Sequence, residues 1–111
     1  MTKDPNKIQT IVVELCNLRI VCAANKHKQD ENLVLIGARH WDKRMHAQWE
    51  VLQKMTIYYK LDSFDFIQGF IDNRGNFHTR EEAFIIATKQ NQIIRKTGGE
   101  NSIQLFSEDL Y

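Results

Sequence analysis

The hydrophobic and polar positions divide the first third of the chain into three apolar runs separated by polar residues. Residues 8–15 (IQTIVVEL) and 19–24 (RIVCAA) contain β-branched side chains, and they predict two antiparallel strands joined by a short reversal. The polar residues 25–32 (NKHKQDEN) predict a hairpin loop, and the apolar run 33–38 (LVLIGA) predicts a third strand. This part of the sequence therefore predicts a β-meander.

A helical spacing follows in residues 41–55. Apolar side chains recur at intervals of four, four, three and three residues, which places them on one side of a helix: Trp41, Met45, Trp49, Leu52 and Met55. Asp42 is a suitable N-cap or first-turn acid for this helix. Residues 58–65 have a mixed pattern that predicts no regular element.

The second half of the chain predicts a hairpin and a second helix. Residues 66–71 (FIQGFI) predict a strand, residues 72–75 (DNRG) a turn, and residues 76–78 an antiparallel return. Thr79 and Glu82 have the spacing of a capping box, so a helix is expected over residues 80–91. Gly98 and Gly99 predict a flexible break. The last residues are expected to dock through apolar anchors: Leu105, Phe106, Leu110 and Tyr111.

Composition and charge fit one soluble α+β domain over residues 1–111, with an antiparallel sheet of about four to six short strands and two main helices. The chain is 42% hydrophobic and 26% charged, and no apolar stretch approaches the ~20 residues of a membrane-spanning helix. No signal-peptide pattern opens it, so a cytosolic protein is expected. Fifteen basic residues against 14 acidic ones argue against non-specific nucleic-acid binding.

The cysteine and histidine spacings predict no metal centre and no disulfide. Cys16 and Cys22 lie in apolar runs, where free thiols behave as small buried hydrophobic groups. His40 and His46 are six residues apart, not the four that direct two imidazoles at one metal ion. No cofactor is expected.

The first candidate binding site lies at the start of the second predicted helix. The free N–H groups of a helix N-terminus and the charge of Arg80 would suit a phosphate next to Asn76, Phe77 and Thr79. The alternative is purely structural, because Thr79 and Glu82 would then only cap the helix while Arg74 and Arg80 remain solvated.

Two further candidates are basic. At the start of the first helix, Arg39 could bind a phosphate through two N–H groups, His40 could donate to one, and Trp41 offers a face for a base. In the alternative interpretation Trp41 begins the core stripe and His40 is an ordinary surface histidine. Arg95 precedes a glycine pair that could close over an anion, or it lies in a solvated loop.

The sequence contains none of the common catalytic motifs, such as GxSxG, a Walker-type GxxxxGK or HExxH. We therefore expect a binding protein and not an enzyme. A small nucleotide-acting enzyme, with His40 as general base and Arg39 as phosphate clamp, remains an alternative because catalytic groups meet in space and not in sequence order. A protein-binding inhibitor of a host factor is a second alternative.

Four co-linear fragments, IVCAAN, GARHWDKRM, QGFIDNRGNFHTREEAF and LFSEDLY, resemble the first type of the phage Thoeris anti-defence sponge family. The resemblance implies a protein of the infected bacterial cytoplasm that sequesters nucleotide second messengers without cleaving them. It implies glycosidic cyclic ADP-ribose as ligand, with cyclic di- or trinucleotides in some members. It also implies an antiparallel sheet with two helices, and a homodimer or a hexamer built from dimers.

The ligand implied by the resemblance combines a pyrophosphate with an adenine. Arginines and helix N-termini suit the first group, and an aromatic face suits the second. The expected phosphate-binding residues are Arg39, Arg44, Arg80 and Arg95, and the expected base-stacking residue is Trp41 or Phe77.

Overall fold

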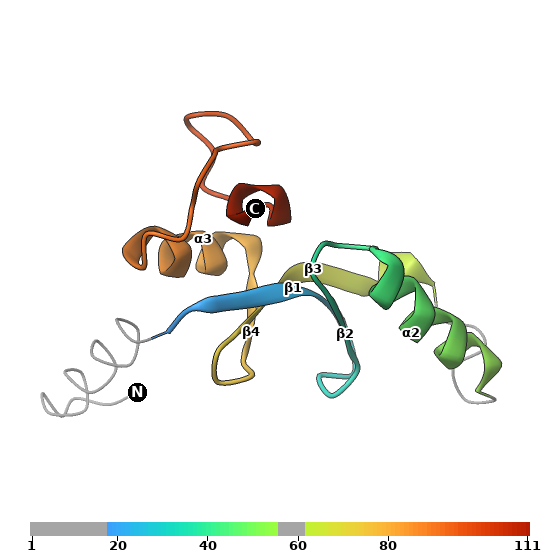
Figure 1. The fold of residues 1–111 in the computed structure, drawn as a ribbon. Helices are drawn as coiled ribbons and strands as arrows, with labels where there is room; N and C mark the ends of the chain where they lie inside the picture. The colour runs from blue at the N-terminus through green and yellow to red at the C-terminus, as the bar shows by residue number, and fades with distance from the viewer. Residues whose placement is uncertain (1–17, 56–61) are drawn as a thin grey trace, which may run out of the picture.

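A computed structural model of the chain describes residues 18–55 and 62–111. These residues form a four-stranded antiparallel sheet in the order β2-β1-β3-β4, together with two α-helices and two short 3₁₀-helices (Figure 1). The strands are β1 (Ile20–His27), β2 (Val34–Gly37), β3 (Phe66–Asp72) and β4 (Phe77–Thr79). The helices are α2 (Lys43–Lys54), α3 (Arg80–Lys89), η2 (Ser63–Asp65) and η3 (Ser107–Leu110). The predicted α+β class is confirmed.

Strand β1 is central, because β2 pairs with it on one side and β3 on the other. The predicted strand at residues 8–15 lies outside the described residues. The prediction of a loop from residue 25 was wrong, since β1 continues to His27. Asn25 is fully buried, and with its amide oriented so that the oxygen faces the indole, it donates to the Ala24 carbonyl (3.1 Å) and accepts from Trp41 Nε1 (3.3 Å); in the opposite orientation its NH₂ group donates to Met45 Sδ (3.0 Å). A polar residue can occupy a buried strand position when its hydrogen bonds are satisfied in this way.

Helix α2 begins two residues later than predicted. Asp42 is its N-cap and accepts from the Met45 N–H (2.9 Å), while Trp41 has a left-handed backbone (φ 57°) that excludes it from the helix. Met45 is fully buried against Leu35 and Phe66, with Trp49 and Leu52 beside it. Met55, the last residue of the predicted stripe, is 43% exposed.

Gln48 fastens α2 to the free edge of β2. Its side chain accepts from the Ile36 N–H (2.9 Å) and donates to the Ile36 carbonyl (2.6 Å). An amide side chain thus takes the place that a neighbouring strand would have, which protects an otherwise unpaired sheet edge.

Helix α3 has the predicted capping box, in which Thr79 Oγ1 accepts from the Glu82 N–H (3.3 Å) and Glu82 Oε1 from the Thr79 N–H (2.9 Å). It ends at Lys89, two residues before the predicted end. The buried side chains of α3 pack on β1, β3 and the chain's last residues, in a cluster that includes Ala23, Phe70, Ala83, Ile86, Ala87 and Leu105. Figure 1 shows α3 and the C-terminal segment on one side of the sheet.

The predicted turn between β3 and β4 is organised by Asp72. Its fully buried carboxylate accepts from the backbone N–H groups of Arg74 (2.7 Å) and Asn76 (3.0 Å), and from His78 Nε2 (2.7 Å). Gly75 has φ 86°, a conformation that favours glycine. Burial favours the neutral acid, but these three hydrogen bonds outweigh it and hold the pKa of Asp72 below its usual range.

The prediction of a docked C-terminal segment is confirmed for Leu105, which is fully buried in the α3 cluster. Asp109 is also buried; its carboxylate accepts from the Thr97 N–H (2.8 Å) and the Phe106 N–H (3.0 Å). Gly99, in the loop between Thr97 and Leu105, has φ 98°. Tyr111 is 44% exposed, so it is not the apolar anchor that was expected.

Replacing the Asp72 carboxylate by an amide should lower stability and reduce its dependence on pH. We expect Asp72→Asn to lower the free energy of unfolding at pH 7 by about 1.5–3 kcal/mol, because charge-assisted hydrogen bonds are lost. The pKa of Asp72 is lower in the folded chain, so its contribution is present above the unfolded value and disappears as pH falls through the folded one. Urea unfolding at several pH values checks this, with exposed Glu31→Gln as control. Equal losses at pH 7 and pH 2.5 would contradict it.

Candidate functional site

Arg80 joins the start of α3 to the C-terminal segment and the sheet. Its Nη1 donates to the Leu105 carbonyl (2.7 Å), its Nη2 donates to Gln68 Oε1 on β3, and the guanidinium lies 4.8 Å from the centre of the Phe106 ring. The Leu105 N–H in turn donates to the Arg80 carbonyl (3.0 Å). Arg80 is thus held in one place by contacts with three segments of the chain.

The electrostatic surroundings of Arg80 are mixed. Burial lowers the pKa of Arg80, while the nearby carboxylates of Glu108, Glu81 and Asp109 raise it. The guanidinium remains charged at neutral pH, since an arginine pKa starts far above that range. A guanidinium has five N–H groups, and two of those on Arg80 are used in the contacts above. The remaining ones can bind an acceptor from outside the chain.

His40 lies on the same side of the sheet. Its Nε2 is 2.7 Å from the Gly69 carbonyl oxygen, and its ring meets Phe70 edge to face at 5.0 Å. A carbonyl only accepts, so Nε2 carries the proton and Nδ1 of the neutral ring is an acceptor. Neutral His40 therefore has no free N–H with which to make the predicted hydrogen bond to a phosphate. Burial lowers the pKa of His40 most; the hydrogen bond to Gly69 opposes it, the charge of Arg80 lowers the pKa further, and Glu108 raises it by less, so the net direction is down.

Arg39 reaches the same region from the loop before α2. Its side chain is exposed, and its guanidinium lies 5.8 Å from the centre of the Tyr111 ring. Its backbone N–H donates to Asp42 Oδ2 (3.2 Å), which fixes the loop against the helix cap. Arg39, His40 and Arg80, predicted as parts of two separate sites, are therefore brought together beside residues 105–111.

Trp41 belongs to a different part of the surface. Its ring contacts Trp49 edge to face (5.7 Å) and His46 (5.8 Å), within the second core cluster. Trp41, His46, Trp49 and Ser63 line a cavity of about 360 Å³ beside α2. Trp41 therefore packs against the core cluster from before the helix, while part of its ring lines the cavity.

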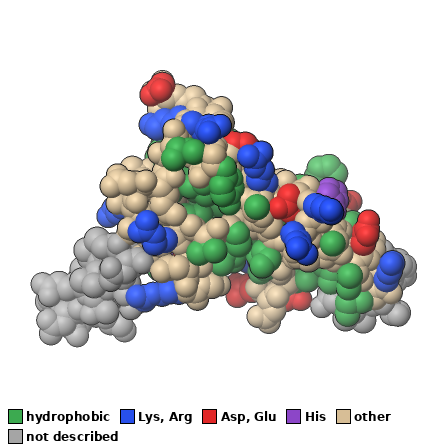
Figure 2. Space-filling view, viewed as in Figure 1, with side chains coloured by type: hydrophobic (Ala, Val, Ile, Leu, Met, Phe, Trp, Pro, Cys, Tyr) green, Lys and Arg blue, Asp and Glu red, His purple; other side chains and the backbone are tan. Residues whose placement is uncertain are grey.

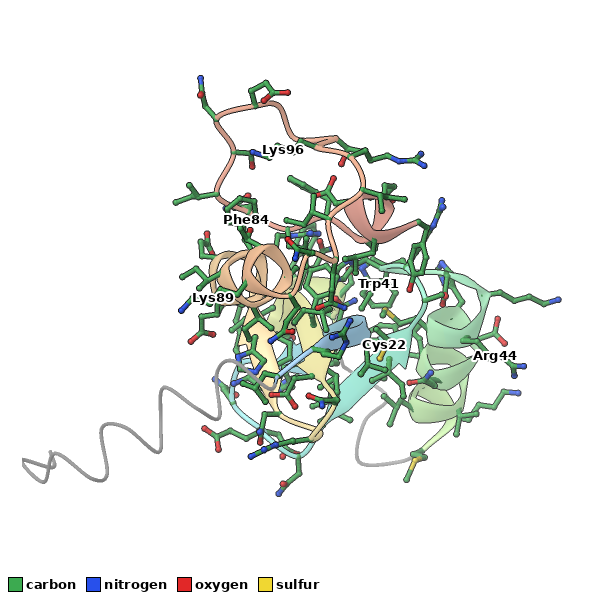
Figure 3. The ribbon with its side chains drawn as sticks, turned by 60° about the vertical axis from the view of Figure 1, so that its left-hand side comes forward. Cys22, Trp41, Arg44, Phe84, Lys89 and Lys96 are labelled. Atoms are coloured by element: carbon green, nitrogen blue, oxygen red, sulfur yellow. The ribbon has the colours of Figure 1, made fainter. Side chains whose placement is uncertain are left out.

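Arg44 also lies apart from Arg80. Figure 3 shows its side chain projecting outward from α2. It borders a cavity of about 280 Å³ together with Cys22, Ile36, Gly37 and Gln48. Cys22 is half-buried there, and burial raises its pKa, with a smaller contribution from Asp42. Cys16 lies outside the described residues.

The residues of the first predicted cluster have mainly structural contacts. Asn76 donates its N–H to Asp72 in the turn, and the Thr79 hydroxyl caps α3. The Phe77 ring lies across Gly69, where a Cβ would meet it at 2.4 Å, and Lys26 Nζ is 5.1 Å from its centre. The strand register puts Phe77 on the face of the sheet opposite Gln68, the partner of Arg80. The strand register therefore does not place the Phe77 ring beside the Arg80 side chain.

Arg95 is exposed in the loop after α3, and no hydrogen bond or ring contact joins it to His40 or Arg80 within the described residues. Lys96, next to it, lies 6.0 Å from the Phe84 ring, on a loop that passes over α3 (Figure 3). No group of three or more His, Cys, Asp or Glu side chains suited to a metal ion occurs in residues 18–55 and 62–111. No helix in this part of the chain is long and apolar enough to span a bilayer.

Sequence reasoning missed the aromatic partners of the arginines. Phe106 lies against Arg80 and Tyr111 against Arg39, although both were expected to be apolar anchors. Gln68 was not singled out at all. The signal available in the sequence was the pair of aromatic residues in LFSEDLY, but nothing in the pattern says which arginine each one meets.

Removing the Arg80 side chain should loosen the C-terminal segment. We expect Arg80→Ala to lower the free energy of unfolding by about 1.5–3 kcal/mol, because the Leu105 carbonyl and Gln68 lose a charged donor. Faster hydrogen exchange of the Leu105 and Thr97 amides should accompany the loss. Arg39→Ala is the matched control: its guanidinium is exposed, so its effect should stay within about 0.5 kcal/mol. Equal effects of the two variants would contradict the role given to Arg80.

The lowered pKa of His40 predicts a stability that depends on pH near neutrality. The pKa of His40 is about 6.5 in the unfolded chain and lower in the folded chain. Between these two pKa values the unfolded state therefore binds more protons than the folded state. Stability is therefore complete above that range and falls as pH drops from about 6.5 toward the folded pKa. His40→Gln should flatten the stability profile between pH 5 and 7, measured by urea unfolding, whereas exposed His46→Gln should not. An unchanged slope in His40→Gln would contradict this assignment.

No curated protein and no solved structure matches the chain. A family model described as phage T4 y16D protein matches residues 19–111, which include all the strands and helices described above. Because this match covers most of the chain, the protein belongs to the family of the phage T4 y16D protein.

Proposed function

We propose that this phage-family protein binds a small anionic, nucleotide-derived ligand and retains it without converting it. The observation that carries the proposal is the meeting of Arg39, His40 and Arg80 beside the C-terminal segment. Two of these residues come from the loop before α2 and one from the start of α3, and the arginines lie against the rings of Tyr111 and Phe106. A cationic group next to an aromatic ring is suited to a phosphate attached to a base.

The charge around Arg80 suits a ligand that is bound by hydrogen bonds and ring contacts as well as by charge. Glu108, Glu81 and Asp109 lie close enough to Arg80 to affect its pKa, so the region is not strongly positive. Figure 2 likewise shows Lys and Arg side chains spread over the visible surface with acidic ones among them, not gathered in one basic patch. Selection of a ligand would then depend on hydrogen bonds and ring contacts as well as on charge.

The ligand class follows from the sequence resemblance, and we propose glycosidic cyclic ADP-ribose, with cyclic di- or trinucleotides as further ligands. On this proposal the protein acts in the cytoplasm of the infected bacterium by removing an immune signal from solution. Because Arg39 is exposed on the single chain, we propose that a homodimer, or a hexamer built from dimers, completes the enclosure.

A retention experiment tests this proposal. Purified protein in excess is mixed with cyclic ADP-ribose isomers and cyclic dinucleotides and filtered, and the retained fraction is heated and analysed by mass spectrometry. We expect depletion of one ligand from the filtrate and its release intact on heating. No depletion would overturn the proposal, and release of a cleaved product would favour the enzyme with His40 as base. Sedimentation of the same samples measures the oligomer.

Arg39 provides the variant for this experiment, because it is exposed and its removal should leave the fold intact. We expect Arg39→Ala to weaken binding by about tenfold to a hundredfold, the loss of one charge-assisted contact. Lys54→Ala is the matched control, since it removes one exposed positive charge at the other end of α2. Equal affinities of the two variants would show that the ligand binds elsewhere.

A further inference from the structure

The sheet has an apolar face that no described element covers. Both helices and the C-terminal segment pack on the opposite face, where Ala23, Leu35 and Phe70 belong to the two core clusters. By the strand register, the uncovered face carries the alternate side chains. We call it the outer face and define it by Val21, Cys22, Ile36, Ile67, Ile71 and Phe77.

The composition of the outer face is that of a buried surface. An antiparallel sheet that faces water on one side normally alternates apolar and polar residues, whereas here the outer positions are apolar apart from Lys26 and Thr79. Among the described residues, Val21 is 55% exposed, Ile36 46% and Ile67 37%. These exposed aliphatic side chains lie on three strands of one sheet face, which suits contact with another apolar surface.

We propose that residues 8–15 of the same chain, IQTIVVEL, cover the outer face. The chain enters the sheet at the right place for this, because the Arg19 N–H donates to Asn73 Oδ1 (3.0 Å) and the Asn73 N–H to the Arg19 carbonyl (2.9 Å). The register shift between Ile20 and Cys22 then makes Val21 the first exposed residue of the outer face. Residues 8–15 precede this end of the sheet by only a few positions in the chain.

The length of this segment is sufficient. Even at the short helical rise of about 1.5 Å per residue, these eight residues span about 12 Å. Four strands spaced about 4.8 Å apart have axes that extend over about the same distance. Residues 8–15 can therefore cross the outer face from the start of β1 without a long connection.

The chemistry of the segment matches the outer face. Five of its eight residues are aliphatic, namely Ile8, Ile11, Val12, Val13 and Leu15, and its one charged residue is Glu14. The charged groups at the outer face are basic: Lys26 within it and Arg44 at the cavity beside Cys22 and Ile36. An acidic, mostly aliphatic segment thus meets a basic, mostly aliphatic surface.

A second copy of the chain fits the outer face less well. Two such faces packed together would bring the basic groups of both copies into one interface. The area is also small: the four strands, of three to eight residues each, cover about 350 Å², compared with about 800 Å² per partner in a standard interface. A tethered segment needs less area, because it loses no translational and rotational freedom on binding.

Cys22 reports directly on the cover, because its half-buried thiol lies on the outer face. In a Cys16→Ser background it is the chain's one cysteine, and its reaction with a thiol reagent is followed at a fixed pH. We expect Ile11→Asp with Val12→Asp to speed the reaction about tenfold, because added charge releases the segment. Thr2→Asp with Asn6→Asp adds the same charge outside residues 8–15, and it should leave the rate unchanged.

The concentration dependence separates the possible covers. Cover by residues 8–15 predicts a rate that is constant over about a hundredfold range of protein concentration. Protection that increases with concentration would mean that a second copy covers the outer face, and it would overturn the proposal. So would equal rates in the two pairs of variants. These results do not depend on ligand binding, so they are independent of the proposed function.

A disulfide provides a second measurement that does not rely on disruptive charges. Ile11→Cys and Val12→Cys are each made in the Cys16→Ser background and oxidised mildly. We expect one of them to form an intrachain disulfide with Cys22, detected as a monomer whose mobility changes on reduction. Formation of Cys22–Cys22 dimers alone, or of no disulfide in either variant, would overturn the proposal.

Discussion

The reciprocal hydrogen bonds between Arg80 and Leu105 are the contact on which the site depends. The Arg80 side chain donates to the Leu105 carbonyl, and the Leu105 N–H donates to the Arg80 carbonyl. These bonds hold the C-terminal segment against the start of α3, so Phe106 lies on Arg80 and Tyr111 is within reach of Arg39. Without them, Arg39 and Arg80 would be surface residues of two unrelated helix starts.

The two faces of the sheet have different roles, because successive side chains along a strand lie on opposite faces. Phe70 and Gln68 point toward the helices, where they support His40 and Arg80. Ile67 and Ile71 point to the outer face. Gly69 lies between Gln68 and Phe70 in β3. Because Gly69 has no side chain, the Phe77 ring can lie across it, and the Gly69 carbonyl accepts from His40. Strand β3 therefore contributes residues to both the candidate ligand site and the outer face.

Structural and binding roles overlap at the residues predicted to bind a ligand. The Thr79 hydroxyl caps α3, and the Asn76 N–H donates to Asp72 in the turn. Arg80 combines both roles, since it stabilises the C-terminal segment and still has N–H groups to offer. Loss of binding in Arg80→Ala would therefore not identify a ligand contact by itself, which is why exposed Arg39 is the better probe.

Local sequence patterns determined the helix and turn elements, because caps, turns and helical stripes involve residues within four positions of each other. The Thr79–Glu82 capping box, the Asp42 cap and the DNRG turn were all predictable. The continuation of β1 through Asn25 was not, since burial of that amide depends on Trp41 in another element. The site could be predicted only in part: the sequence identified Arg39, His40 and Arg80 as candidates. Their meeting with Phe106 and Tyr111 was decided by the tertiary structure, because contacts between residues 25 to 72 positions apart leave no periodic signal.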